Sequence, residues 1–406
     1  MNPAPPKDRQ TLLKWVSICG VYMSSFAMMY VWTVMPRTLE AAAWTGSWIG
    51  ALYAARKIVD SVSMWVWAGV ADRSGRLTLW LKIQFTAGAL ALVPLLWSTN
   101  VTVIALSVLG CSVALGGALP LLDTLSIQGV GAERFGRVRL WGSAGFLCLA
   151  LTGSAIGYWG DYEVLAQAAR GLIVGFGALA ALCAWMLPQD HPVDTDALPQ
   201  ALDAPVKSIW RTMGTGSFAL LLGIACLHWA AQSPFNMFIV ALFEQKGMPA
   251  WAPGLSVAAG VSFELVVMAK APSFLRRYRG HHLIAVACAV GALRWGLSAW
   301  TTHVWVLIGL QVLHGLSFGL FFAAVVSMVH NNVPKGRQAQ AQAALYLVMF
   351  ALGSLIGNAC SGVGLEHHGA ASIYWGAALL EALLVPAVLA WGHTVGAPMT
   401  RVSDPA

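Results

Sequence analysis

Charged and polar side chains interrupt several long apolar segments of this 406-residue chain. In "ERFGRVRLWGSAGF", Arg139 is followed at once by residues that belong in lipid or in a packed helix. A charged side chain at the centre of a membrane helix costs about 2.5–3.5 kcal/mol on insertion scales, so it normally faces a partner or a polar cavity. These groups are therefore candidate site residues. They are Arg56, Lys57, Asp60, Asp123, Arg139, Glu264, Arg294 and His314.

Arg139, Ser143 and Phe146 are spaced by four and three residues, which places them on one face of a helix. A guanidinium fork, a hydroxyl and an aromatic ring suit a carboxylate that is joined to a ring. We expect Arg139 to bind such a substrate, and to pair with Asp123 when substrate is absent. For each single charge the alternative is a structural salt bridge.

Glu264, His314 and Asp123 are the candidates for proton coupling, and Arg294 is expected to hold the substrate carboxylate together with Arg139. A carboxylate or imidazole inside a bundle can gain and lose a proton, as transport coupling requires. For His314 the alternative is a neutral histidine that is bonded within the bundle.

The elements that position these residues are membrane helices. The chain is 58% hydrophobic and 10% charged, whereas a soluble domain carries roughly a quarter charged residues. Apolar runs of about 20 residues or more, enough to cross a bilayer, recur twelve times. The predicted spans are 13–34, 45–69, 77–97, 101–129, 137–160, 164–187, 215–243, 252–275, 282–301, 304–331, 339–362 and 370–393.

A Pro- and Asp-rich break at 188–211 divides these spans into six and six. The sequence thus predicts an all-α integral membrane protein with an N-terminal bundle (1–187), a cytoplasmic linker (188–211) and a C-terminal bundle (212–406). Weakly similar loops in the two halves indicate pseudo-symmetry. Most Lys and Arg residues fall on the side of the termini, which predicts cytoplasmic termini.

Several function classes are not expected. The formal charge of +7 is explained by basic cytoplasmic loops, so nucleic acid is not an expected partner. The seven cysteines stand singly, without metal-binding spacing. Neither a Walker-type phosphate loop nor a catalytic triad is present, so the sequence predicts neither an enzyme nor a cofactor.

The stretch "GVADRSGR" resembles the loop between helices 2 and 3 of the major facilitator superfamily. The resemblance implies twelve helices, alternating access and a conformational latch in this loop, where an Asp at a helix end can hold an Arg. The latch residues are Gly69, Asp72, Arg73, Gly75 and Arg76.

Within that superfamily the chain is similar to the lactose permease and phenylpropionate permease branch. "PLLD", "FGRVRLWG", "SFELVV", "ALRWGLS" and "LHGLSFG" carry the resemblance, which implies site roles for Asp123, Arg139, Glu264, Arg294 and His314. Ser317 stands where the lactose permease has an acid, and Ala231 and Gln311 replace its Asp–Lys pair. Glu264 or Asp123 is therefore favoured over His314 as the proton carrier.

Together these observations predict a monomeric transporter in a bacterial inner membrane that moves a small organic acid, such as an aromatic acid, with a proton. One alternative is proton-linked sugar or nucleoside uptake, in which Asp123 and Glu264 accept hydrogen bonds from hydroxyl groups. The other is a membrane receptor or assembly factor that keeps the fold without transport.

Overall fold

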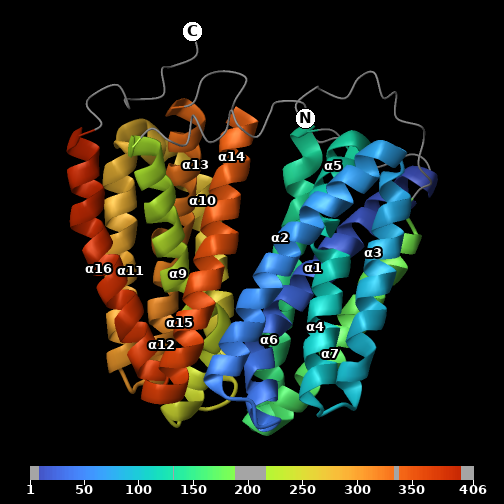
Figure 1. The fold of residues 1–406 in the computed structure, drawn as a ribbon, viewed down its shortest axis with the longest axis horizontal. Helices are drawn as coiled ribbons and strands as arrows, with labels where there is room; N and C mark the ends of the chain where they lie inside the picture. Colours follow the sequence, from blue (N-terminus) through green and yellow to red (C-terminus); the bar gives the residue numbers. More distant parts are fainter. Residues whose placement is uncertain (1–8, 131, 188–215, 333–337, 395–406) are drawn as a thin grey trace. The chain divides into compact units, whose positions relative to one another are not determined.

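A computed structural model describes residues 9–130, 132–187, 216–332 and 338–394, and the regular elements within these ranges are helical (Figure 1). Contacts divide the chain into two compact units, and each is described by itself. The described residues of unit 1 lie within Met1–Trp44 and Ala55–Leu198, and those of unit 2 within Thr45–Ala54 and Pro199–Ala406. The predicted linker 188–211 lies outside the described residues, and the predicted domain limits stay a prediction.

Within the described ranges, unit 1 is built from seven α-helices and one 3₁₀ turn. They are α1 (Arg9–Ala41), α2 (Gly46–Ser74), α3 (Leu77–Leu92), η1 (Val93–Leu96), α4 (Val101–Leu115), α5 (Ala118–Val130), α6 (Ala132–Trp159) and α7 (Tyr162–Trp185). The first turns of α2, up to Ala54, belong to unit 2.

In unit 2, two helical stretches are interrupted by 3₁₀ or π turns. Its elements are α9 (Gly216–Gln245), α10 (Ala252–Arg277), α11 (Gly280–Trp300), α12 (Val304–Leu310), the 3₁₀ turn η3 (Gln311–Leu313), the π turn η4 (Gly315–Leu320), α13 (Phe321–Asn332), α14 (Gln338–Tyr346), the π turn η5 (Leu347–Leu352), α15 (Gly353–His368) and α16 (Ala370–Thr394).

In unit 1, α1 packs against α6 and α7. Close approach to α6 depends on small residues, because a Cβ on Gly142 would lie 2.9 Å from the ring of Phe26. Small residues at helix contacts are typical of membrane bundles, where lipid gives no hydrophobic drive for association. Thr38 adds a hydrogen bond to the Ala166 carbonyl of α7, at 2.9 Å.

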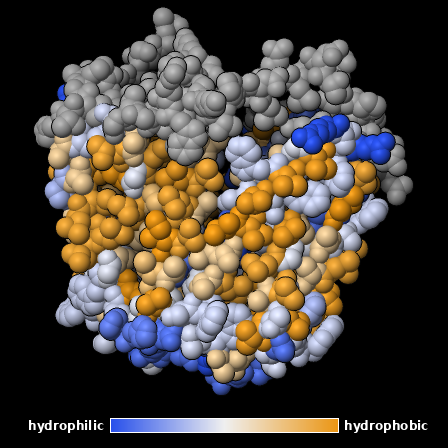
Figure 2. All heavy atoms as spheres, viewed as in Figure 1, coloured by the Kyte–Doolittle hydropathy of each residue, from blue (hydrophilic) through white to orange (hydrophobic). Residues whose placement is uncertain are grey.

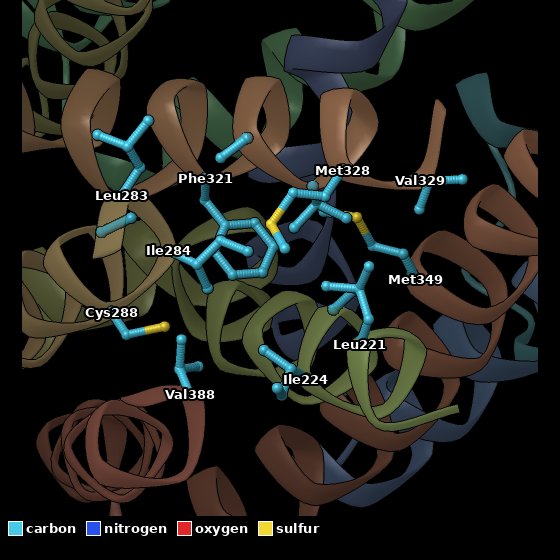
Figure 3. Packing of buried hydrophobic residues seen from close by; sticks show 14 of the residues in the cluster. Leu221, Ile224, Leu283, Ile284, Cys288, Phe321, Met328, Val329, Met349 and Val388 are labelled. Carbon is cyan, nitrogen blue, oxygen red and sulfur yellow. The ribbon is translucent and has the colours of Figure 1, made fainter. Parts of the chain in front are cut away.

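In unit 2, α9, α11, α13 and α16 enclose a core that includes Ile284, Phe321 and Val388 (Figure 3). Pro234 lies inside α9 and cannot donate a helical hydrogen bond, and Phe238 beyond it has non-helical angles (φ −119°, ψ 22°). The helix is therefore kinked. Glycines of α15 permit close packing against α9, since a Cβ on Gly357 would lie 2.5 Å from the Ala230 carbonyl.

Each of the twelve predicted spans corresponds to helical segments of the structure. The described residues contain eleven helical stretches long and apolar enough to cross a membrane. The remaining predicted span, 45–69, is helical in α2 but carries Arg56, Lys57 and Asp60. Figure 2 shows apolar side chains along the flanks of the helices and polar residues toward the lower end of the view. The chain is a multi-pass membrane protein.

The predicted span 101–129 is not one continuous helix. It breaks into α4 and α5 at Gly116 and Gly117. A Cβ on Gly116 would lie 2.6 Å from the Asp60 carbonyl, and one on Gly117 would lie 2.6 Å from the Cβ of Trp67. Backbone packed this closely against α2 has no room for larger side chains, which explains the two glycines at the break.

Candidate functional site

Asp123 of α5 is the centre of a polar group in unit 1. One carboxylate oxygen accepts a hydrogen bond from the Tyr22 hydroxyl of α1 at 2.5 Å, and the other accepts from the Arg139 guanidinium of α6 at 2.9 Å. The structure therefore brings Asp123 and Arg139 together in one ion pair. Tyr22 is a third member that sequence reasoning missed, because nothing in its apolar surroundings sets it apart from a core tyrosine.

Arg139 is well placed to bind an anion. Its side chain is 51% exposed, whereas that of Asp123 is 27% exposed. An arginine has five N–H donors, and the ion pair uses Nη1, so donors remain for a ligand. The ring of Phe135 lies 6.0 Å from the guanidinium carbon. This geometry allows a carboxylate to bind alongside Asp123 or in its place.

Ser143 and Phe146 continue along α6 from Arg139, and both are partly buried. Phe146 contacts the ring of Tyr30 edge-on, with centroids 6.0 Å apart. The hydroxyl of Tyr30 is buried and has no hydrogen-bond partner among the described residues. The predicted face of α6 thus holds a guanidinium, a hydroxyl and an aromatic ring. Its role in substrate binding stays a prediction.

The charged residues of α2 form their own group in unit 1. Nζ of Lys57 and Nε of Arg56 lie 3.7 and 4.0 Å from the carboxylate of Asp60. Arg56 also donates to Ser112 of α4 at 3.3 Å and covers the ring of Trp32 at 3.9 Å. These contacts account for the three charges as structural partners.

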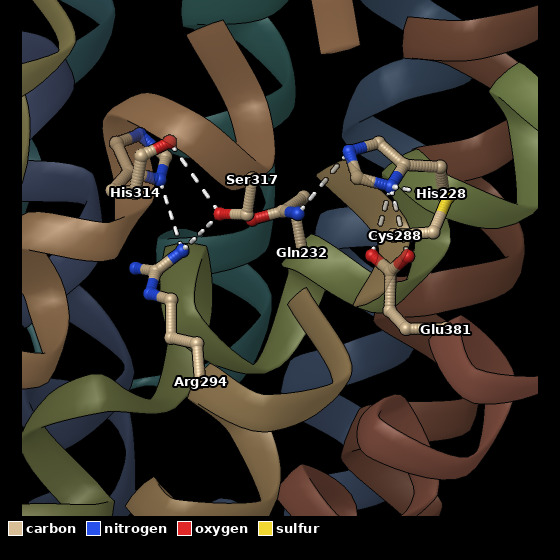
Figure 4. A network of polar contacts seen from close by, with 7 residues as sticks. All are labelled: His228, Gln232, Cys288, Arg294, His314, Ser317 and Glu381. Atoms are coloured by element: carbon tan, nitrogen blue, oxygen red, sulfur yellow. Dashed lines mark hydrogen bonds and ion pairs between the residues drawn. The ribbon is translucent and has the colours of Figure 1, made fainter. Parts of the chain in front are cut away.

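Arg294 of α11 is the centre of the polar network in unit 2 (Figure 4). Its side chain is fully buried, and its Nε and Nη2 both donate to Oε1 of Gln311, at 3.0 and 2.7 Å. Its Nη1 lies 3.0 Å from Nδ1 of His314 and 3.3 Å from the Ser317 hydroxyl. Gln311 and Ser317, which depart from the lactose permease pattern, are therefore partners of this arginine.

The contacts of His314 fix its tautomer. A guanidinium only donates, so Nδ1 of His314 must accept from Arg294 and carries no hydrogen. The ring proton then stands on Nε2, which lies 3.3 Å from the Glu264 carboxylate of α10. In this arrangement His314 is neutral and links Arg294 to Glu264. The predicted triad of Glu264, Arg294 and His314 is brought together, although Arg294 has no exposed surface in this conformation.

Irregular helical turns align the partners of Arg294. Gln311 and His314 stand at either end of the 3₁₀ turn η3, in which residues three apart are eclipsed, and Ser317 follows in the π turn η4. Close contact with α10 brings Glu264 within reach. A Cβ on Gly315 would lie 2.9 Å from the carbonyl carbon of Phe263, which is backbone.

The latch residues lie at the end of α2 and in the turn that follows. Gly75 has φ +63°, a left-handed conformation that favours glycine, and its N–H donates to the Ala71 carbonyl at 2.9 Å. Arg73 and Arg76 are exposed, and no atom lies within 4 Å of a Cβ built on Gly69. The Asp72 side chain lies outside the described residues, so the latch stays a prediction.

A second buried group in unit 2 was not predicted. His228 of α9 lies with Nδ1 2.8 and 3.0 Å from the two carboxylate oxygens of Glu381 in α16, and both side chains have no exposed surface (Figure 4). Cys288 of α11 lies 4.0 Å from the same nitrogen. The signal that could have found it is the acid within the apolar run "ALLEALLVPAVL".

The chain is similar to one protein named as a probable transporter and to one named as a permease. It is 25% identical over 262 residues to the "Probable 3-phenylpropionic acid transporter" of Escherichia coli (strain K12), covering 62% of each chain. It is 25% identical over 338 residues to the maltose permease of Geobacillus stearothermophilus, covering 82% of this chain and 83% of the relative. The chain thus matches less than two thirds of the length of the first relative.

Solved structures agree on the fold. A crystal structure of the nucleoside transporter NupG matches with a TM-score of 0.81 and 19% identity, over 95% of this chain and 99% of that one. A D-xylose-proton symporter matches with a TM-score of 0.70 and 14% identity, over 97% and 99% of the two chains. The named relatives are transporters or permeases, in agreement with the expectation that the chain is not an enzyme.

These similarities agree with the expected resemblance to the major facilitator superfamily. The model of the MFS_1 like family matches residues 21–375, from within α1 to the start of α16. The chain belongs to the MFS_1-like family of the major facilitator superfamily.

Proposed function

We propose that this protein is a secondary transporter that moves a small organic acid together with a proton by alternating access. The observation that carries the proposal is the group of Tyr22, Asp123 and Arg139. A half-exposed guanidinium held by one carboxylate can exchange that partner for the carboxylate of a substrate. When it does so, the Tyr22 hydroxyl still satisfies Asp123.

The aromatic environment supports an aromatic acid as substrate. The ring of Phe135 lies 6.0 Å from the Arg139 guanidinium carbon. Further along α6, Phe146 contacts the ring of Tyr30 in α1. An aromatic ring packs favourably on such side chains while its carboxylate reaches the guanidinium. The similarity to a probable 3-phenylpropionic acid transporter points the same way.

Sugar or nucleoside uptake is the second candidate, and a specific observation favours it. The similarity to the maltose permease covers more of the chain than that to the phenylpropionic acid relative. In that case the Asp123 and Glu264 carboxylates would accept hydrogen bonds from hydroxyl groups, and Arg139 would hold Asp123 in place.

The test is ligand stabilisation of the purified protein by 3-phenylpropionate, maltose and uridine. A ligand that binds the folded state at a hundred times its Kd adds about 2.7 kcal/mol of stability. We expect stabilisation by 3-phenylpropionate that is lost in Arg139→Ala. Loss of a charged hydrogen bond of about 1.5–3 kcal/mol corresponds to about ten- to hundredfold weaker binding.

Arg137→Ala is the matched control, since Arg137 is an exposed arginine on the same helix, two residues before Arg139. It should bind 3-phenylpropionate like the wild type. Arg139→Lys keeps the charge but loses the fork, so it should bind weakly. Stabilisation by maltose or uridine that survives in Arg139→Ala would replace the organic-acid proposal with the second candidate.

For proton coupling we propose that Glu264 carries the proton, with neutral His314 beside it. Glu264 is 21% exposed, whereas Arg294 beyond it is fully buried, so Glu264 has access that the arginine lacks. In proteoliposomes, Glu264→Gln should exchange 3-phenylpropionate across the membrane but fail to accumulate it along a pH gradient. Glu163→Gln, on an exposed residue of α7, is the control. Gradient-driven accumulation by Glu264→Gln would contradict the assignment.

A further inference from the structure

His228 and Glu381 form a buried pair that is not part of the proposed transport site. They lie on α9 and α16, 153 residues apart in the sequence, and their contact is made wholly inside unit 2. Removing two ionisable groups from water is costly, and such pairs are retained where their charge or proton serves a purpose. Glycine makes room for this one, because a Cβ on Gly291 would lie 3.0 Å from Cδ of Glu381.

The contact between Nδ1 of His228 and Oε2 of Glu381 is a hydrogen bond, whereas Oε1 lies close to the same nitrogen without a hydrogen-bond partner among the described residues. Nδ1 of His228 lies 2.8 and 3.0 Å from the two oxygens of Glu381, whereas a nitrogen and an oxygen bound to one tetrahedral zinc ion lie about 3.3 Å apart. The Sγ of Cys288 lies 4.0 Å from the same Nδ1. The arrangement is that of a carboxylate that holds the Nδ1–H of an imidazole.

The other ring nitrogen faces a group that can adapt to two protonation states. Nε2 of His228 lies 3.4 Å from Nε2 of Gln232, whose Oε1 is buried and has no hydrogen-bond partner among the described residues. In neutral His228, Nε2 accepts from the amide N–H. In the imidazolium, Nε2–H would donate to Oε1 after a half-turn of the amide, whose oxygen and nitrogen are nearly alike in shape.

The charges of the buried groups and Glu264 in unit 2 sum to one negative charge when both histidines are neutral. Arg294 and Glu381 are the described, fully buried side chains that are ordinarily charged, and they balance one another. Glu264 adds a second negative charge. With both histidines neutral the group then carries one excess negative charge, and binding one proton neutralises it. Nη1 of Arg294 lies 3.0 Å from Nδ1 of His314, whose Nε2 lies 3.3 Å from the Glu264 carboxylate, so contacts join the arginine to Glu264.

No other element packed on α9 offers a competing site among the described residues. From α11 come Cys288 and Arg294, and from α16 comes Tyr374, whose hydroxyl donates to the Pro234 carbonyl at 3.2 Å. Phe321 of α13 stacks on the His228 ring, with centroids 3.6 Å apart. Ser354 of α15 and Phe350 of η5 contact Trp229 and do not titrate. Helix α10 also packs on α9, and it carries Glu264, whose charge is already included above.

We propose that His228, held by Glu381, is a second binding site for the coupled proton, occupied when Glu264 is ionised and empty when Glu264 is protonated. The proton enters and leaves at Nε2 of His228, while Nδ1–H stays on Glu381. This inference rests on the proposed proton coupling, because it gives that proton two alternative positions in unit 2.

Nitrogen-15 NMR of histidine-labelled protein tests the inference without any substrate. An imidazolium and a neutral ring give different nitrogen shifts, and Phe321→Leu identifies the His228 signal because it removes the stacked ring. We expect imidazolium at neutral pH in the wild type and a neutral ring in Glu264→Gln, which mimics a protonated Glu264. Glu381→Gln should leave His228 neutral in both backgrounds.

A His228 signal that is the same in the wild type and in Glu264→Gln would overturn the proposal. So would a signal that moves on addition of Zn²⁺ and requires Cys288, since a metal ion would then occupy the group. Failure of the transport proposal looks different. In that case wild-type proteoliposomes would show no accumulation of 3-phenylpropionate along a pH gradient, whatever the state of His228.

Discussion

At the scale of single residues, the central charge of each candidate group has neighbours that hydrogen-bond to it. Asp123 receives hydrogen bonds from Tyr22 and Arg139, and Arg294 is engaged by Gln311 and His314. Removing one partner of a buried charge leaves it desolvated and unpaired, which costs more than the hydrogen bond itself contributed.

Gln311→Leu should therefore lower the free energy of unfolding by about 1.5–3 kcal/mol, because two N–H groups of buried Arg294 lose their acceptor. Gln342→Leu is the matched control. Its amide makes one neutral hydrogen bond, to the Val326 carbonyl at 2.9 Å, so the loss should be about 1 kcal/mol. Chemical denaturation in detergent measures both. Equal losses would show that Gln311 does not support the arginine.

Lys246, just outside the membrane span of α9, gives a pH-dependent test. Its Nζ donates to the Ala299 and Thr301 carbonyls at the end of α11, at 2.8 Å each, and burial lowers its pKa below the ordinary 10.5. The unfolded chain therefore binds more protons than the folded one between the lowered pKa and 10.5. Below this window the cost of burying the charge is fully present, and it disappears as the pH rises through the window.

The stability of the wild type relative to Lys246→Met should consequently increase as the pH rises toward 10.5. Thermal unfolding of both proteins in detergent over an alkaline pH series measures this difference. At neutral pH the variant should already be less stable, because two carbonyls at the C-terminus of α11 lose their donor. A difference that does not change with pH would contradict the lowered pKa of Lys246.

At the scale of elements, glycines determine how closely the helices approach and so whether side chains meet. Gly315 and Gly319, and separately Gly353 and Gly357, are spaced by four residues, which is typical of close helix contacts in membranes. Cβ atoms on Gly315 and Gly319 would meet α10, and those on Gly353 and Gly357 would meet α9.

Gly315→Ala should destabilise the protein by about 1–3 kcal/mol, because its Cβ would meet the backbone of Phe263 at 2.9 Å and push α10 away. The same shift would separate Glu264 from His314 and weaken proton-driven accumulation. Gly309→Ala is the control, since no atom lies within 4 Å of a Cβ there. Unfolding midpoints and gradient-driven uptake of 3-phenylpropionate measure the two effects. Equal behaviour of the two variants would contradict the role of close packing.

At the scale of the whole molecule, the distribution of charge predicts the orientation in the membrane. Arg73 lies in the last turn of α2 and Arg76 follows that helix, and Arg276 and Arg277 end α10, all at the helix ends assigned to the cytoplasm. The loop between α3 and α4, with Thr99, carries no Lys or Arg and is predicted to lie on the other side.

Cysteine labelling measures this orientation. In a background without the seven native cysteines, Thr99→Cys should react with an impermeant thiol reagent when the membrane is intact. Arg76→Cys should react only after the membrane is permeabilised. Both positions are exposed, so accessibility reports the side of the membrane. The reverse pattern would invert the predicted topology.

The sequence alone was sufficient for the class of fold, the positions of the helices and the family. Hydropathy and span length are local properties, and a bilayer obliges each segment to satisfy its own backbone hydrogen bonds, so the helices could be predicted one at a time. The sequence also identified Asp123, Arg139, Glu264, Arg294 and His314, because a charge inside an apolar run is visible without knowing its partner.

Only the tertiary structure decided which groups meet. Tyr22 pairs with Asp123 across 101 residues and His228 with Glu381 across 153, and neither tyrosine nor histidine differs by sequence from an ordinary core residue. The partners of Arg294 depend on the 3₁₀ and π turns that align Gln311, His314 and Ser317. Helix rotation and close packing at glycines set these pairings. Both are properties of helices in contact, which no single segment encodes.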